Sequence, residues 1–369
     1  MLTDHIVKNT LATTFRKQGG DMCVRGENVM TETSLKVNPM LRSKPPRRLR
    51  AMKIMAACGF VASILAANIA SSEPLARLRI AVGQRGVAES EVAEVGQKQN
   101  IFQKHGLDLE VFYTSGSGET IQTVISRSAD IGVSAGLSGA LGAYSKGAPI
   151  RVIGSTMSGD SSLYWYVRAD SAIRAPEDVK GKTVAYSTNG SSTHNVVLRM
   201  QTQLKVPFTP VATGGPPGTF TQVMTGQIDV GWSGAPFMID ELEKGRIRTL
   251  WRATDIPALK EATTRIIVAS ADLTEGRFEL VEKFLDAYRE TIDFIYKSPQ
   301  GASAYAEWAQ MPVPVAERAL KEFLPYAAVN PDRIIGLQDA MQEAVELKFM
   351  PKPLDADEVA TFIRIPKRR

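Results

Sequence analysis

The sequence predicts an α/β protein of two similar lobes, and two observations support this prediction. From Leu78 onward, strand-like and helix-like segments alternate, which is typical of parallel sheets covered by helices on both faces. Two stretches also resemble each other when one residue is gapped. The matched positions are Gly118, Gln122, Asp130, Gly132 and Ser134 in the first stretch, and Gly218, Gln222, Asp229, Gly231 and Ser233 in the second. With 369 residues, the chain is long enough for two lobes of ordinary size.

The first half of this pattern follows directly from hydrophobic periodicity. It predicts strands at 78–84, 107–114 and 130–136, and helices at 92–107 and 118–129. Gly106 is the residue expected to end the first of these helices.

The second half repeats the scheme. The predicted order is a strand at 182–188, a helix through about Leu204, a strand near 209–215, a helix at 218–226 and a strand within 228–236.

Two further strand-like segments, within 161–170 and at 264–273, are interpreted as the chain crossing between the lobes. Residues 274–369 are expected to be mostly helical and to cover the first lobe. We therefore expect 77–167 and 265–369 to form one discontinuous lobe and 168–264 the other, with hinges near 167–170 and 263–266.

The basic character of the chain comes from its N-terminal part. Residues 1–72 contain 11 of the 44 Lys and Arg residues and 4 of the 39 Asp and Glu residues. Residues 73–369 therefore contain 33 basic and 35 acidic residues. The remainder is therefore close to neutral. This balance argues against a nucleic-acid partner or a membrane-binding surface.

Residues 1–72 are interpreted as a leader that is absent from the mature protein. Basic residues at 47–53 precede an apolar run at 54–67 and then small residues, which is the layout of a cleaved secretory signal. The run is shorter than the roughly 20 residues of a membrane span. We expect a misassigned start, with Met40 or Met52 as the natural one, a signal peptide at about 40–72 and export to the periplasm. Both cysteines, Cys23 and Cys58, lie in this leader.

The sequence does not favour an enzyme. Ser233 lies in a Gly-Trp-Ser-Gly-Ala stretch that resembles a nucleophile elbow, but no histidine follows it, and after the leader the chain has only His105 and His194. The glycine-rich stretch at 116–121 lacks the third glycine of a dinucleotide site. Two histidines without cysteine do not suggest a transition-metal centre. We therefore predict no catalytic residue, no cofactor and no metal.

Small polar residues gather where the predicted strands end. The densest group, 187–193, precedes a helix, where it either caps the helix or also holds a polar ligand at the helix N-terminus. In open α/β sheets, ligands bind at the carboxyl ends of strands. The candidate ligand-binding residues are Gln84, Arg85, Gly116, Ser117, Ser134, Ala135, Ser158, Ser187, Asn189, Ser191, Ser192, Thr193, Gly215, Pro216, Trp232 and Ser233.

Four stretches resemble one known family. They are 78–84, 106–134, 171–194 and 226–237, and the most specific is Ala-Pro-Glu-Asp-Val-Lys-Gly-Lys-Thr-Val before the hydroxyl-rich group. They resemble the periplasmic substrate-binding proteins of ABC importers, in the group that includes nitrate, taurine, alkanesulfonate and thiamine-precursor binders. The resemblance implies a type II periplasmic binding protein: two α/β lobes, a two-strand hinge and a ligand cleft between the lobes. It also implies a monomer that delivers a small molecule to an inner-membrane ABC permease.

One departure from the family bears on the ligand. Where members often carry Trp-Glu-Pro, this chain has Gly234, Ala235 and Pro236, and Trp232 is a candidate to replace the aromatic wall. The missing acid disfavours an amine such as taurine, and Arg85 offers a positive charge, so we expect an organic anion of the sulfonate or carboxylate type. Two alternatives stay open: an enzyme of cofactor or thiamine-precursor metabolism on the same fold, and a solute-binding sensor.

Overall fold

The computed structural model describes residues 74–87 and 89–368. The expectations for the leader at 1–72 lie outside these residues. Within the described ranges, no helix has the length and apolar character needed to cross a membrane.

The first sheet has five strands in the order β2-β1-β3-β10-β4. Their bounds are β1 Ala76–Gly83, β2 Leu107–Thr114, β3 Ile131–Gly136, β4 Ile150–Ser158 and β10 Thr263–Ser270. Strand β1 pairs in parallel with β2 and β3, whereas β10 runs antiparallel to both β3 and β4. The parallel pairing expected from the sequence is therefore present in β1, β2 and β3, whereas β10 departs from it by running antiparallel to its neighbours.

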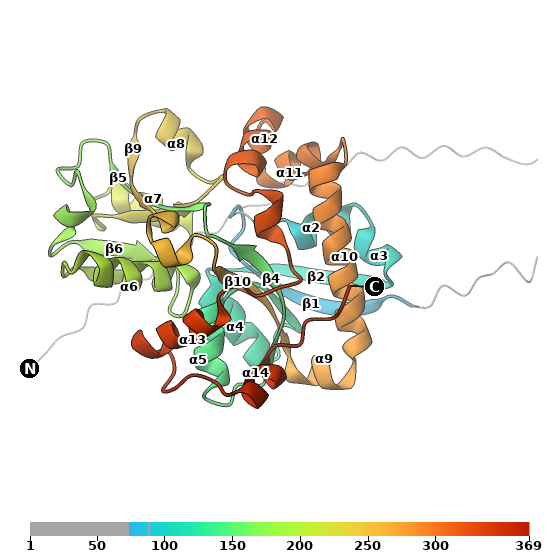
Figure 1. Cartoon of the computed structure of the whole chain (residues 1–369). Helices are drawn as coiled ribbons and strands as arrows, with labels where there is room; N and C mark the ends of the chain where they lie inside the picture. The colour runs from blue at the N-terminus through green and yellow to red at the C-terminus, as the bar shows by residue number, and fades with distance from the viewer. Residues whose placement is uncertain (1–73, 88, 369) are drawn as a thin grey trace, which may run out of the picture. The chain divides into compact units, whose positions relative to one another are not determined.

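Helices cover both faces of this sheet (Figure 1). Leu78, Ile80 and Val82 of β1 belong to a core shared with α2, α3, α10, α11 and α12, whereas Ala81 belongs to a core shared with α4, α5, α13 and α14. This division follows from the two-residue period of a strand, which sends alternate side chains to opposite faces. We call the first sheet with these helices the first lobe.

The helices of the first lobe come from both ends of the described chain. Their bounds are α2 Val92–Lys98, α3 Ile101–Lys104, α4 Ser117–Ile125, α5 Leu137–Tyr144, α9 Ala271–Gly276, α10 Phe278–Lys297, α11 Gly301–Ala309, α12 Val313–Glu322, α13 Leu337–Glu346 and α14 Ala356–Phe362. The helix expected at 92–107 is interrupted at Asn100, which has a left-handed backbone (φ 59°).

The second lobe has two small sheets around its own core. Strands β8 (Gly231–Gly234), β5 (Leu163–Arg168) and β9 (Ile247–Arg252) pair antiparallel, and β6 (Thr183–Tyr186) pairs in parallel with β7 (Thr209–Ala212). A bridge between Val184 and Val230 joins the two sheets. The helices of the second lobe are α6 Ser192–Leu204, α7 Pro216–Met224 and α8 Ile239–Glu243.

Strand β5 differs from its expected role as a crossing strand. Tyr164, Trp165 and Tyr166 are buried in the second core, and the whole of β5 pairs with β8 or β9. The chain therefore leaves the first sheet after β4 and reaches the second lobe through 159–162. It returns through 253–262, between β9 and β10. Strand β5 therefore lies in the lobe whose core buries its three aromatic side chains.

The internal similarity has a structural counterpart. Thr114 Oγ1 lies 2.8 Å from Thr120 Oγ1 at the start of α4, and Thr213 Oγ1 lies 2.6 Å from Thr219 Oγ1 at the start of α7. These pairs are 99 positions apart, as are Asp130 and Asp229. Each aspartate accepts a backbone N–H bond from the neighbouring strand, Asp130 from Arg79 at 2.8 Å and Asp229 from Thr183 at 2.9 Å. The repeat is therefore continuous, and the one-residue gap was unnecessary.

Candidate functional site

A small cavity lies where strand ends of both lobes meet. Seven of the predicted ligand-binding residues line it: Gln84, Ser117, Ser134, Ser187, Ser192, Thr193 and Trp232. Its volume is about 10 Å³, which is roughly the space that one water molecule needs. The lobes are therefore closed on each other in this structure.

Beside this cavity lies a larger groove of about 590 Å³, whose lining includes Gly86, Phe220, Phe237 and Met311. A bridge between Val87 and Pro236 lies next to both spaces, because Val87 lines the cavity and Pro236 lines the groove.

Several predicted residues lie outside the cavity lining. The guanidinium of Arg85 pairs with Glu94 at 3.1 Å and lies over the ring of Tyr113, so it is an exposed surface group. Ser158 lies 2.7 Å from Thr263, hydroxyl to hydroxyl. Neither Arg85 nor Ser158 is among the residues that line the cavity.

Five further predicted residues and Asn189 also lie outside the cavity lining. Asn189 accepts a hydrogen bond from Tyr186 at 2.6 Å, and Ser233 donates to the carbonyl of Phe237 at 3.2 Å. Ala135 is buried inside β3, Gly116 precedes α4, and Gly215 and Pro216 begin α7.

The hydroxyl-rich group 187–193 both caps a helix and contributes to the cavity lining. Ser191 caps α6, because its Oγ accepts the N–H of His194 at 3.0 Å. Ser187, Ser192 and Thr193 line the cavity. His194 itself is half-buried, its ring stacks on Tyr186 at 4.3 Å, and burial lowers its pKa.

Two glycines of the first lobe bring its helices against the backbone of this hydroxyl-rich loop. A Cβ atom added at Gly118 of α4 would lie 1.9 Å from the carbonyl oxygen of Asn189, and one at Gly139 of α5 would lie 2.3 Å from that of Gly190. The N–H of Gly118 also donates to Thr188 Oγ1 at 3.1 Å. The lobes therefore meet backbone to backbone, and this surface leaves no space for a methyl group.

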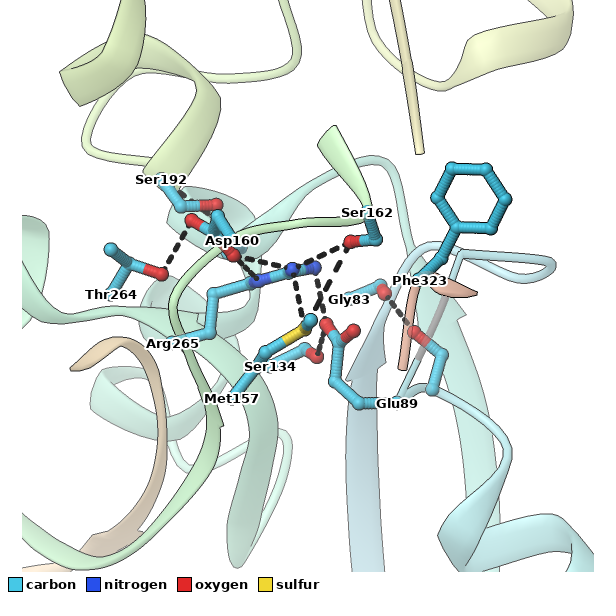
Figure 2. Close-up of polar contacts among 12 residues, drawn as sticks. Gly83, Glu89, Ser134, Met157, Asp160, Ser162, Ser192, Thr264, Arg265 and Phe323 are labelled. Atoms are coloured by element: carbon cyan, nitrogen blue, oxygen red, sulfur yellow. Dashed lines mark hydrogen bonds and ion pairs between the residues drawn. The ribbon is translucent and has the colours of Figure 1, made fainter. Parts of the chain in front are cut away.

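An ionic cluster, missed by the sequence analysis, contributes Glu89 and Arg265 to the cavity lining, and Figure 2 shows its polar contacts. Arg265 of β10 is only 3% exposed and donates to Asp160 Oδ1 from Nε at 3.0 Å and from Nη2 at 2.6 Å. Its Nη1 donates to Glu89, and Nη2 also donates to Ser162 at 3.1 Å. Thr264 donates to the second oxygen of Asp160.

This ionic cluster connects both crossing segments. Asp160 and Ser162 lie in the segment that leaves the first sheet, and Arg265 lies just after the returning one. Burial alone lowers the pKa of Arg265, but the carboxylates of Asp160 and Glu89 outweigh it and raise that pKa above its ordinary value.

Two buried carboxyl groups follow β1 in the loop that leads to α2. Glu89 and Glu91 are each 1% exposed. Burial raises the pKa of Glu89 to about 7, although Arg265 and the hydroxyl of Ser134 act in the opposite direction. Burial also raises the pKa of Glu91 to about 8. Near neutral pH, both groups therefore retain protons that an exposed glutamate loses.

We expect the substitution Glu91→Gln to stabilise the protein at alkaline pH. The folded pKa of Glu91 lies above the ordinary value of 4.5, so the folded state holds a proton that the unfolded state releases. Its contribution to stability is complete below about pH 4.5 and is lost as the pH rises through about 8. Urea unfolding should show a gain on the order of a few kcal/mol for Glu91→Gln at about pH 8.5 and little difference at about pH 5. An equal effect at both pH values would contradict a buried, protonated Glu91.

The described residues hold no group of three or more His, Cys, Asp or Glu side chains placed to bind a metal ion.

The fold now defines the class of protein. Two α/β lobes, two crossing segments and a cavity at the facing strand ends constitute the type II periplasmic binding protein fold. The chain belongs to the NMT1/THI5-like family, which it matches over residues 93–302. A sequence search of curated proteins gives no match.

Solved structures show the same fold at low sequence identity. The alkanesulfonate-binding protein from Xanthomonas axonopodis pv. citri bound to MOPS has a TM-score of 0.65 and 18% identity, over 79% of this chain and 99% of that one. The periplasmic aliphatic sulphonate-binding protein from Escherichia coli has a TM-score of 0.60 and 20% identity, over 79% and 93%. The periplasmic nitrate-binding protein from Synechocystis has a TM-score of 0.60 and 13% identity, over 79% and 86%.

Proposed function

We propose that this protein is the extracytoplasmic solute-binding component of an ABC importer, which captures one small molecule between its lobes and delivers it to a membrane permease. The observation that carries the proposal is the cavity: strand ends and helix N-termini of both lobes converge on it, and most of its lining is small or polar. The three similar structures described above are themselves named as binding proteins, two of them periplasmic. We place this chain in the periplasm as a monomer that acts with an inner-membrane permease.

We further propose that the lobes close by rotation about the two crossing segments. Among the described residues, the first lobe then comprises 74–158 together with 263–368, and the second comprises 163–252. The hinges are 159–162 and 253–262, in place of the segments 167–170 and 263–266 expected from the sequence. A hinge needs a few residues outside regular sheets that absorb the change in backbone angles. Both crossing segments meet this requirement.

The nature of the solute is a separate matter. An organic anion of the sulfonate or carboxylate type was favoured by the sequence, in part because of Arg85. Since Arg85 pairs with Glu94 at the surface, support for an anion reduces to Arg265 and the N-terminus of α6. Arg265 already has two carboxylate partners.

Native mass spectrometry of the freshly purified mature protein tests the proposed function. We expect one small molecule bound per chain, released unchanged in mass when the protein is denatured. Incubation of the protein with excess of that molecule, followed by mass spectrometry of the solution, should give no product. Conversion of the molecule would instead indicate an enzyme on this fold. Absence of any bound small molecule, together with no thermal shift in a screen of sulfonates, carboxylates and amines, would contradict solute binding.

A further inference from the structure

Two residues that line the cavity, Glu89 and Trp232, each have a buried polar atom without a hydrogen-bond partner among the described residues, Glu89 Oε2 and Trp232 Nε1. The two residues are 1% and 0% exposed. An unpaired buried polar atom is energetically unfavourable, and native proteins leave few such atoms. When Glu89 is ionised, its Oε2 is an acceptor, and Trp232 Nε1 is a donor. A ligand that donates to the first and accepts from the second would satisfy both.

The local structure holds Glu89 so that only one of its carboxyl oxygens is engaged. Oε1 accepts from Ser134 Oγ at 2.8 Å and from Arg265, as Figure 2 shows. The backbone of Glu89 is left-handed, with φ 62°, a conformation that is unfavourable for a non-glycine residue. This turn, which follows β1, brings Glu89 into the cavity lining. The second carboxyl oxygen of Glu89, Oε2, has no partner among the described residues and is available to a ligand.

The charges around Glu89 leave an excess of acid. The charged groups that face it are Arg265 from β10, Asp160 from the first crossing segment and Glu91 from its own loop. Three carboxyl groups therefore face one guanidinium, and that guanidinium already donates twice to Asp160. The raised pKa values of Glu89 and Glu91 keep the excess of negative charge small near neutral pH. An entering anion would add a further negative charge to this buried cluster. An entering cation would reduce the excess.

At each of the two helix N-termini that could favour an anion, one backbone N–H donates to a hydroxyl group of the opposite lobe. The N–H of Ser192 in α6 donates to Ser117 Oγ at 3.4 Å, and the N–H of Gly118 in α4 donates to Thr188 Oγ1 at 3.1 Å. In the closed protein, these two N–H groups therefore form hydrogen bonds between the lobes and are not free to bind an anion.

We propose that the cavity recognises a solute with a protonated nitrogen, such as an amine, amidine or guanidine, whose N–H group donates to Glu89 Oε2 and whose adjoining acceptor atom receives the N–H of Trp232. This inference rests on the proposed solute-binding function and specifies its substrate class. It reverses the expectation drawn from the missing acid at Ala235, because Glu89 supplies a carboxyl group from the first lobe.

Calorimetry with pairs of small ions of similar shape and opposite charge tests the proposal. The probes are acetamidinium against acetate and guanidinium against nitrate, titrated into the mature protein to about 10 mM, well above the roughly 0.1 mM dissociation constants that the best four-atom ligands reach. At about pH 7, in lightly buffered sodium chloride so that no buffer amine competes, we expect each cation to bind at least tenfold more tightly than its anionic counterpart, with proton release read from the change in pH. Because the pKa of Glu89 is about 7, cation binding should release about half a proton.

Three variants identify the groups involved. Glu89→Gln keeps an acceptor for Ser134 and Arg265, and it should weaken cation binding at least tenfold and abolish proton release. Trp232→Phe should weaken binding but leave proton release intact, and it provides a second test if Glu89→Gln folds poorly. The matched control is Glu94→Gln, at a carboxyl group that pairs with Arg85 on the surface and should change neither quantity.

Tighter binding of acetate or nitrate, with proton uptake, would overturn the cation assignment while it supports solute binding. Failure of all four probes would also overturn the assignment. The proposed function would then be judged separately, by the molecule that native mass spectrometry finds on the purified protein.

Discussion

The substitution Gly139→Ala is expected to hold the lobes apart without destabilising either lobe. In the closed structure, the added methyl group would lie 2.3 Å from the carbonyl oxygen of Gly190. The atoms that the methyl group would meet are backbone atoms of Gly190, which cannot move aside as a side chain can. The clash is therefore relieved only if the lobes separate. Within helix α5 itself alanine is favoured over glycine, by up to about 1 kcal/mol. The free energy of unfolding should therefore stay constant or rise slightly.

The consequence for binding should be large. A solute held in the open protein contacts only one lobe, and we expect its affinity to fall at least 100-fold, equivalent to about 2.7 kcal/mol. Small-angle X-ray scattering should show a larger radius of gyration for Gly139→Ala than for the wild type. Titration with the solute recovered from the wild-type protein should show the loss of affinity.

Gly218→Ala is the matched control. Gly218 lies in α7 of the second lobe, and a Cβ atom there would come no closer than 3.7 Å to any neighbour outside its own helix backbone and adjacent residues. It should bind and scatter as the wild type does. Identical scattering and affinity for Gly139→Ala would show that this surface does not govern closure. A loss of several kcal/mol in stability would mean that the contact is part of a permanent core.

Hydrophobic periodicity was sufficient to predict most elements of the first lobe and the cavity residues at strand ends. Gln84, Ser134 and Trp232 could be placed because ligands collect at the carboxyl ends of strands in α/β folds. The same reasoning could not place β5. Its run of aromatic residues is apolar enough for either core, and the choice depends on which core has room for Trp165.

The ionic cluster was beyond local pattern analysis for a different reason. Glu89 and Arg265 are separated by 176 positions in the chain, so no spacing rule connects them. One signal was present: Arg265 interrupts the apolar strand Thr263–Ser270. An arginine is rarely fully buried without a charged partner, so its position in such a strand implies a buried acid. Which acid fulfils this role depends on the fold, and the structure identifies Asp160 and Glu89.

The substitution Arg265→Met is expected to destabilise the protein by about 3–5 kcal/mol at about pH 8, because it leaves Asp160 and Glu89 buried without a cation. Both carboxyl groups would then bind protons more readily in the folded state. A group with a raised folded pKa contributes stability at low pH and loses it as the pH rises. The destabilisation should therefore shrink between about pH 8 and pH 5, which urea unfolding at the two pH values would show.

Two comparisons assign the effect to the buried charges. Arg77→Met removes an ion pair with Glu110 whose side chains are 69% and 52% exposed, and it should change stability by less than about 1 kcal/mol. Adding Asp160→Asn to Arg265→Met should recover part of the lost stability at about pH 8, since it removes one of the unpaired charges. If Arg265→Met is as mild as Arg77→Met at that pH, the crossing segments are held by packing. A large loss that the second substitution partly reverses means that the buried charges fix both segments where the lobes join.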